Sequence, residues 1–204
     1  MRKLTSILAT IVFTTAWASI FSACEREDAR PLINISGEFT NTPDLSAGFI
    51  EVLLPPEPAL LEPALEPAGK PEEEYSLGKN NVPMVRRTVL FPVKYFVAGT
   101  WTCMEQLDIT RSVLTCSSAT FDPEAGAFKG NLHITLSDID GSQLFLGGTF
   151  VTYPDFSNKS FLQCEGGSGK FVSTEGWMTA IGSINPQTGA NALTVFGEMT
   201  APLK

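Results

Sequence analysis

Acid–base chemistry in this chain would have to use few side chains, because its 204 residues include a single histidine, His133. A hydrolytic triad or a zinc site would need that histidine to meet a nucleophile, a carboxylate or further ligands. A surface or cross-strand histidine is the simpler interpretation. Two carboxylates, Glu165 and Glu175, flank a glycine-rich segment, and one that pointed into an apolar cavity could act as a base with a raised pKa. Solvated loop carboxylates are the alternative, so no catalytic residue is assigned.

Metal and cofactor chemistry has equally little support in the sequence. Asp138, Asp140 and Ser142 offer oxygen ligands, but they do not form the full, regularly spaced set that calcium requires. We therefore expect neither a metal site nor a cofactor.

Three cysteines in the second half of the chain could support redox chemistry or a disulfide. Cys103, Cys116 and Cys164 form no CxxC motif, which argues against a zinc site and against thioredoxin-like chemistry. In an exported protein a disulfide is permissible. The pairing we favour joins Cys103 to Cys116 on neighbouring strands and leaves Cys164 over. Three buried free thiols are the alternative.

A glycine-rich segment contains Gly166, Gly167 and Gly169, with Gly176 shortly after it. A phosphate-binding loop would need a following helix N-terminus, or a lysine followed by Ser or Thr. Here Lys170 is followed by phenylalanine and a predicted strand. The glycines therefore indicate a backbone bend that brings the chain back into a sheet.

The composition excludes one large class of partner. Lys and Arg number 14 against 22 Asp and Glu, giving a net charge of −8, and no basic patch is available to neutralise phosphates. We therefore expect no nucleic-acid binding. Hydrophobic residues make up 43% of the chain and charged residues 18%, which is sufficient for a packed core.

The N-terminus is typical of an export signal. Two basic residues at positions 2 and 3 precede an uncharged, largely apolar stretch over residues 4–23. The stretch ends in Phe-Ser-Ala-Cys, which resembles a bacterial lipobox, so we predict a signal peptide over residues 1–23 and acylation of Cys24. The alternatives are secretion after cleavage at Ala18, within an A-x-A pattern, and an uncleaved membrane anchor. The lipoprotein interpretation places the protein at a bacterial cell envelope, anchored to a membrane on its periplasmic or surface side.

The mature chain is predicted to have three parts. Residues 24–54 form an N-terminal segment with one or two strands, which could belong to the following domain. Residues 55–83 contain three Glu-Pro-Ala units and further Pro and Glu, a composition that favours extended polyproline II and a solvated spacer. A peptide ligand for a partner domain is the alternative function of this spacer. Residues 84–204 form the main domain.

The main domain has the pattern of an antiparallel β-protein. Short stretches alternate between apolar and polar residues, most strictly over residues 131–137, where Leu132, Ile134 and Leu136 share one face. Further strands are expected over residues 85–91, 93–97, 107–115, 143–153 and 192–199. Two Asx-Pro-x-x-Gly turns, over residues 122–126 and 185–189, separate such stretches. No helical period follows residue 84, so we predict an all-β sandwich or barrel.

The glycine-rich segment and its surroundings resemble one known family. Gly166-Gly-Ser-Gly-Lys-Phe171 followed by Gly176 is similar to the GGTGxF…G signature of the allene oxide cyclase and dirigent type of β-barrel, with Ser168 in place of threonine. The order of hairpins around it is similar as well. The resemblance implies a small antiparallel barrel, often around a hydrophobic cavity, and a homo-oligomer in some relatives. The catalytic residues of the family lie outside the matching motif, so none is transferred.

These observations lead to a functional prediction. Aromatic side chains on the predicted strands must form most of the core, and four of them could line a cavity: Phe150, Phe171, Trp177 and Phe196. We expect a lipoprotein whose barrel binds a small apolar ligand without converting it. An isomerase or cyclase acting on a lipid-like substrate is one alternative, with Glu165, Glu175 or His133 as its candidate groups. A purely structural protein with a filled barrel is the other.

Overall fold

The computed structural model describes residues 30–58, 74–77 and 83–203 of the chain. The predicted signal peptide, Cys24 and most of the predicted spacer lie outside these residues. The elements are β1 (Leu32–Pro43), η1 (Leu45–Ala47), β2 (Phe49–Leu53), β3 (Glu57–Pro58), β4 (Glu74–Leu77), β5 (Pro83–Arg86), β6 (Thr88–Pro92), β7 (Lys94–Trp101), β8 (Val113–Asp122), β9 (Ala127–Ser137), β10 (Gln143–Thr152), β11 (Ser157–Ser168), η2 (Gly169–Phe171), β12 (Gly176–Ile184) and β13 (Asn191–Thr200). Among the described residues there is no helix long and apolar enough to cross a membrane.

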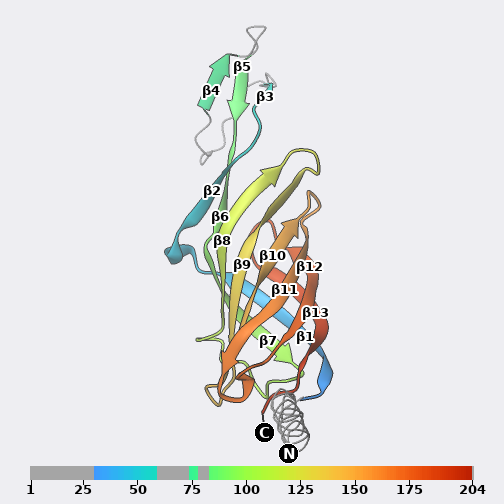
Figure 1. Ribbon diagram of the computed structural model, residues 1–204. Coiled ribbons are helices and arrows are strands. Elements are labelled where there is room, and N and C mark those ends of the chain that lie inside the picture. Colours follow the sequence, from blue (N-terminus) through green and yellow to red (C-terminus); the bar gives the residue numbers. More distant parts are fainter. Residues whose placement is uncertain (1–29, 59–73, 78–82, 204) are drawn as a thin grey trace, which may run out of the picture. The chain divides into compact units, whose positions relative to one another are not determined.

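Eight strands form a closed antiparallel barrel in the order β1-β13-β12-β11-β10-β9-β8-β7 (Figure 1). The run from β7 to β13 consists of neighbouring hairpins, and β1 closes the ring by pairing with both β7 and β13. Closure leaves the barrel without an open strand edge. The prediction of an all-β fold with an antiparallel barrel is confirmed.

The barrel begins earlier in the sequence than the predicted range of residues 84–204. β1 belongs to the predicted N-terminal segment, residues 24–54, yet it is a full barrel strand. It alternates as the other strands do: Ile35 and Phe39 are buried, and the residues between them are more exposed. Its inward row continues through a glycine and a polar residue, Gly37 and Asn41, which interrupt the alternation of apolar residues in this segment.

Two smaller sheets lie between β1 and β7 in the sequence. β2 pairs with β6, and β3, β5 and β4 form a three-stranded sheet in that order. β3, β4 and the first residue of β5 fall within the range predicted as a spacer, residues 55–83. Residues 59–73, which carry most of the Glu-Pro-Ala repeat, lie outside the described residues.

The two Asx-Pro-x-x-Gly turns form as predicted. The Asp122 Oδ1 atom accepts hydrogen bonds from the backbone N–H groups of the second and third residues after it, and the Asn185 Oδ1 atom does the same. The glycines that end these turns, Gly126 and Gly189, have φ angles of 61° and 69°. Each turn thus fixes the register of a barrel hairpin.

The barrel interior follows the period-two pattern of the sequence. Leu132, Ile134 and Leu136 of β9 point inward and are at most 6% exposed, as predicted. The predicted strand over residues 107–115 is wrong in its first half, because β8 begins only at Val113. Leu107 is nevertheless buried: it belongs to a loop that pairs with Asp138 through an isolated bridge.

Candidate functional site

The barrel encloses an apolar cavity in the half that lies near the β10–β11 and β12–β13 turns. It contains about 670 Å³ of space not occupied by protein atoms, including its open part, and the centre of a water-sized sphere can occupy about 50 Å³ of it. Side chains from all eight barrel strands contribute, and Phe91 is added from β6. The apolar wall includes Phe39, Leu114, Leu132, Phe150, Leu162 and Val195.

No side chain that lines this cavity, all of them in the described part of the chain, belongs to an Asp, Glu, His, Lys or Arg. Its titratable groups are Tyr95 and Cys116. Burial, followed by the nearby Cys116 thiol, raises the pKa of Tyr95 to about 12. Burial also raises the pKa of Cys116, against a hydrogen bond with the Ser118 carbonyl oxygen. Both groups are therefore neutral at physiological pH, and the cavity provides no charged acid or base.

Five polar side chains gather at the end of the cavity near the turns. The Asn158 Nδ2 atom donates to the Thr152 Oγ1 atom at 2.9 Å, and the Ser160 hydroxyl donates to the Asn158 Oδ1 atom at 3.4 Å. Asn41 and Asn191 lie directly opposite each other on β1 and β13. Their Oδ1 atoms are buried, and neither has a hydrogen-bond partner among the described residues. These five residues were not predicted, because polar residues at the end of a strand look like turn residues in the sequence.

The other end of the barrel is filled by side chains. Leu136, Leu144, Phe171, Met178 and Met199 are fully buried there, and none of them lines the cavity. Phe171 is part of η2 and lies inside the barrel end, whereas the sequence predicted that it would re-enter a strand. The cavity is thus closed on this side by packed core.

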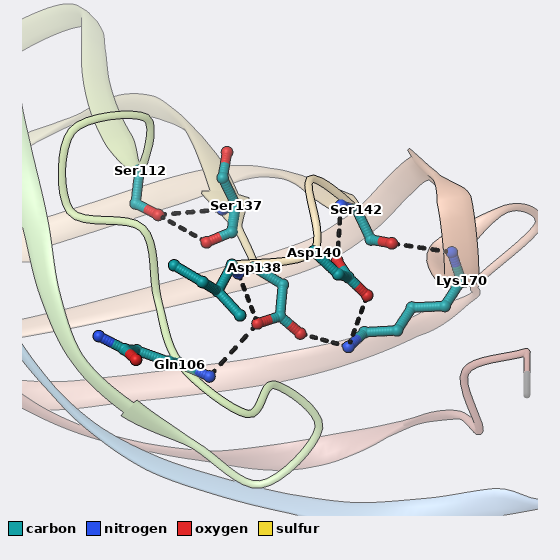
Figure 2. A network of polar contacts seen from close by, with 8 residues as sticks. Gln106, Ser112, Ser137, Asp138, Asp140, Ser142 and Lys170 are labelled. Carbon is teal, nitrogen blue, oxygen red and sulfur yellow. Dashed lines mark hydrogen bonds and ion pairs between the residues drawn. The ribbon is translucent and has the colours of Figure 1, made fainter.

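A polar network holds η2 against the β9–β10 turn at this closed end (Figure 2). The Lys170 ammonium group contacts the Asp138 carboxylate, which is 1% exposed, and lies 3.3 Å from the Asp140 Oδ2 atom. The Asp138 Oδ1 atom also accepts from the backbone N–H groups of Gln106 and Ile139, at 3.3 and 2.7 Å. Burial opposes ionisation of Asp138, but these hydrogen bonds outweigh it and lower its pKa. The Lys170 ammonium group and the Asp138 and Asp140 carboxylates therefore hold η2 and the β9–β10 turn together at this barrel end.

The glycine-rich segment has a structural role in that arrangement. Gly166 and Gly167 belong to β11, Gly169 begins η2, and Gly176 begins β12. Gly169 has a φ of 59°, and a Cβ atom there would lie 2.3 Å from the Ser142 Oγ atom. The Ser142 hydroxyl in turn accepts a hydrogen bond from the Lys170 N–H. The segment therefore bends and packs against the β9–β10 turn, as the bend interpretation expects.

The four aromatic residues predicted to line a cavity have different positions. Phe150 does line it, and Phe171 is buried in the closed end. Trp177 and Phe196 are 43% and 44% exposed and lie on the outer face of β12 and β13. Their neighbours Met178 and Val195 occupy the inward positions. Both faces of these strands carry apolar residues, so the sequence could not fix which set points inward.

The three cysteines are free thiols, and the favoured Cys103–Cys116 bridge is absent from the structure. Cys116 faces the cavity from β8, whereas Cys103 lies in the loop after β7, within electrostatic range of Cys164. Burial, and then the Cys103 thiol, raise the pKa of Cys164 to about 11. β7 and β8 are neighbours, but β8 pairs only with the first residues of β7, over Lys94–Phe96. Cys103 lies beyond the far end of β7, so it is not opposite Cys116.

The predicted acid–base candidates lie outside the cavity. The His133 Nδ1 atom is 3.2 Å from the Glu165 Oε2 atom, above Gly147 of the intervening strand, and both side chains are about half exposed. Glu175 is exposed in the loop before β12. In the part of the chain that the structure describes, no group of three or more His, Cys, Asp or Glu side chains is arranged to hold a metal ion.

Comparison of the chain with protein-family models, with curated proteins and with solved structures gave no match. The fold and the cavity are therefore the basis for any functional conclusion.

Proposed function

We propose that this protein is an exported bacterial lipoprotein whose barrel binds a small apolar molecule at the cell envelope and does not convert it chemically. The observation that carries the proposal is the cavity, which has an apolar wall and no charged side chain among its lining residues. Binding of an apolar ligand in such a cavity is favourable because it removes the apolar surface of the ligand from water. The resemblance of residues 166–176 to the allene oxide cyclase and dirigent signature agrees with a cavity-bearing barrel.

The absence of charge in the cavity lining favours binding over catalysis. An isomerase or cyclase would need a group that transfers a proton or stabilises developing charge beside the ligand. His133, Glu165 and Glu175 all lie outside the lining, and Tyr95 and Cys116 have raised pKa values. The space within the barrel likewise favours a binding role over that of a filled, purely structural barrel.

The location rests on the N-terminal sequence. A signal peptide over residues 1–23 followed by an acylated Cys24 would attach the protein to a membrane. Residues 55–83 do not link Cys24 to the barrel as the spacer interpretation expects, because β1 precedes them and is already a barrel strand. The membrane is the partner we propose for the N-terminus, and a small apolar molecule is the partner of the barrel.

Mass spectrometry of the full-length product from a bacterial membrane fraction tests both parts. We expect a mature chain that begins at Cys24 and carries acyl chains, and a chain beginning at Ser19 would contradict the lipoprotein proposal. Under native conditions we expect an additional mass of a small molecule that is lost on denaturation. A protein that binds no added small apolar compound would contradict the proposed barrel function.

A further inference from the structure

Two buried amide oxygens of residues that line the cavity have no hydrogen-bond partner among the described residues. Asn41 and Asn191 are opposite each other in the β1–β13 register, and both line the cavity. Asn41 is 2% exposed, and neither Oδ1 atom has a hydrogen-bond donor among the described residues. A buried acceptor that remains unpaired destabilises a protein, so a pair of them at one point of a cavity requires an explanation.

The other polar residues at the same end of the cavity are paired. Thr152, Asn158 and Ser160 form a chain of hydrogen bonds on β10 and β11. At this end of the barrel the polar side chains of β10 and β11 are therefore hydrogen-bonded to one another. The carboxamide oxygens on β1 and β13 have no such hydrogen bond. Of the four buried side-chain atoms without a partner among the described residues, only the Asn41 and Asn191 oxygens belong to residues that line the cavity.

We infer that the Asn41 and Asn191 carboxamide oxygens accept hydrogen bonds from a hydroxyl group of the bound molecule, which makes the ligand of this cavity a small apolar alcohol. The inference rests on the proposed function, since it concerns the same cavity. In this arrangement the hydroxyl lies at the inner face of the β1–β13 pair, beside Asn41 and Asn191. The apolar part of the ligand lies against Phe39, Leu193 and Val195.

The chemistry of the cavity excludes charged ligands. A carboxylate would place negative charge beside two carbonyl oxygens with no cation in the lining, and an ammonium group would be buried without a carboxylate. A neutral hydroxyl supplies the donor at a much lower desolvation cost. The space is also small, because the centre of a water-sized sphere can occupy only about 50 Å³ of it, so the cavity suits a small ligand.

The test compares 1-hexanol with methyl pentyl ether, two isomers of the same size of which only the alcohol donates a hydrogen bond. Apparent dissociation constants are measured by NMR titration of the full-length protein in one detergent. The same titrations on the Asn41→Leu and Asn191→Leu variants correct for partition into detergent, because partition is the same for every variant. For each protein we compare the ratio of the dissociation constant of the ether to that of the alcohol. We expect this ratio to be about five to one hundred times larger for wild type than for either variant.

A matched control separates a ligand-binding role from a structural one. Asn158 is the same residue type at the same end of the cavity, but its amide is hydrogen-bonded. Asn158→Leu should lower the thermal unfolding midpoint of the ligand-free protein, whereas Asn41→Leu and Asn191→Leu should not. A drop in midpoint for the Asn41 or Asn191 variant equal to that of Asn158→Leu would overturn the inference.

The binding outcomes distinguish the inference from the proposed function. If alcohol and ether bind wild type and the two asparagine variants with the same relative affinity, the cavity binds apolar molecules but the hydroxyl inference is wrong. If neither compound binds, the proposed function fails and the inference fails with it.

Discussion

Replacing Lys170 with methionine should weaken the closed end of the barrel substantially. The change removes the cation that contacts Asp138 but keeps most of the side-chain volume, and Asp138 is 1% exposed. Breaking a fully buried ion pair costs about 3–5 kcal/mol. Lys170 is 21% exposed, and Asp138 keeps two backbone N–H donors. We therefore expect the free energy of unfolding to fall by about 2–3 kcal/mol at pH 7, measured by urea titration with circular dichroism.

The pH dependence gives a second readout of the same contact. Hydrogen bonds hold the pKa of folded Asp138 below its ordinary value of 3.8. A carboxyl group whose pKa is lowered on folding stabilises fully above its unfolded pKa, and that stability is lost as pH falls through the folded pKa. The difference in the free energy of unfolding between wild type and Lys170→Met should therefore have its full value at pH 7. It should become smaller as the pH falls below about 3.8.

An exposed ion pair in the same barrel provides the control. Lys129 contacts Asp122 at 2.5 Å, with side chains 49% and 28% exposed. Because water screens this pair, Lys129→Met should change stability much less than Lys170→Met. Equal losses in the two variants, or a Lys170→Met deficit that does not narrow in acid, would refute the assignment of a buried, stabilising contact at the barrel end.

Three further predictions concern the cavity, the glycine-rich segment and a thiol. Ala180→Leu places three extra carbons at a cavity-lining position that is 2% exposed, so it should weaken 1-hexanol binding about tenfold or more in NMR titration, while circular dichroism remains that of a folded barrel. An affinity equal to wild type would place the ligand elsewhere. Gly169→Ala should lower the unfolding free energy by about 1–3 kcal/mol in urea titration, because φ is 59° and the new Cβ would meet Ser142; an unchanged midpoint would contradict this. Cys164, with a pKa near 11, should react with iodoacetamide at pH 8 far more slowly in the folded than in the urea-unfolded protein, as followed by peptide mass spectrometry.

Sequence patterns were sufficient to predict the fold class because the strands obey a clear rule. β9 alternates strictly, and its inward set, Leu132, Ile134 and Leu136, is the one that the sequence indicates. The Asx-Pro-x-x-Gly turns fixed two hairpins. The sequence predicts one or two strands over residues 24–54 but does not define the length of β1, because its inward row includes Gly37 and Asn41, which interrupt the apolar pattern. Its position between β7 and β13 depends on pairing across the whole chain, which local periodicity does not contain.

The candidate site was much less predictable than the fold. Phe150 was expected to line a cavity and does so, but Trp177 and Phe196 lie on the outer face, because β12 and β13 carry apolar residues on both sides. Asn41 and Asn191 are 150 residues apart in number and become neighbours only through the β1–β13 register. No local signal links two such residues, so sequence reasoning could not have joined them.

The most direct test of the central claim is NMR titration of the full-length, methyl-labelled protein with 1-hexanol. If the cavity binds the ligand, the methyl signals of Leu132, Leu162 and Val195 should shift and saturate, since these side chains line it. The methyl signals of Leu32 and Ile181, which are 66% and 45% exposed, should stay unchanged. Shifts confined to those exposed residues, or no saturable shift within the cavity, would contradict a binding function for the barrel.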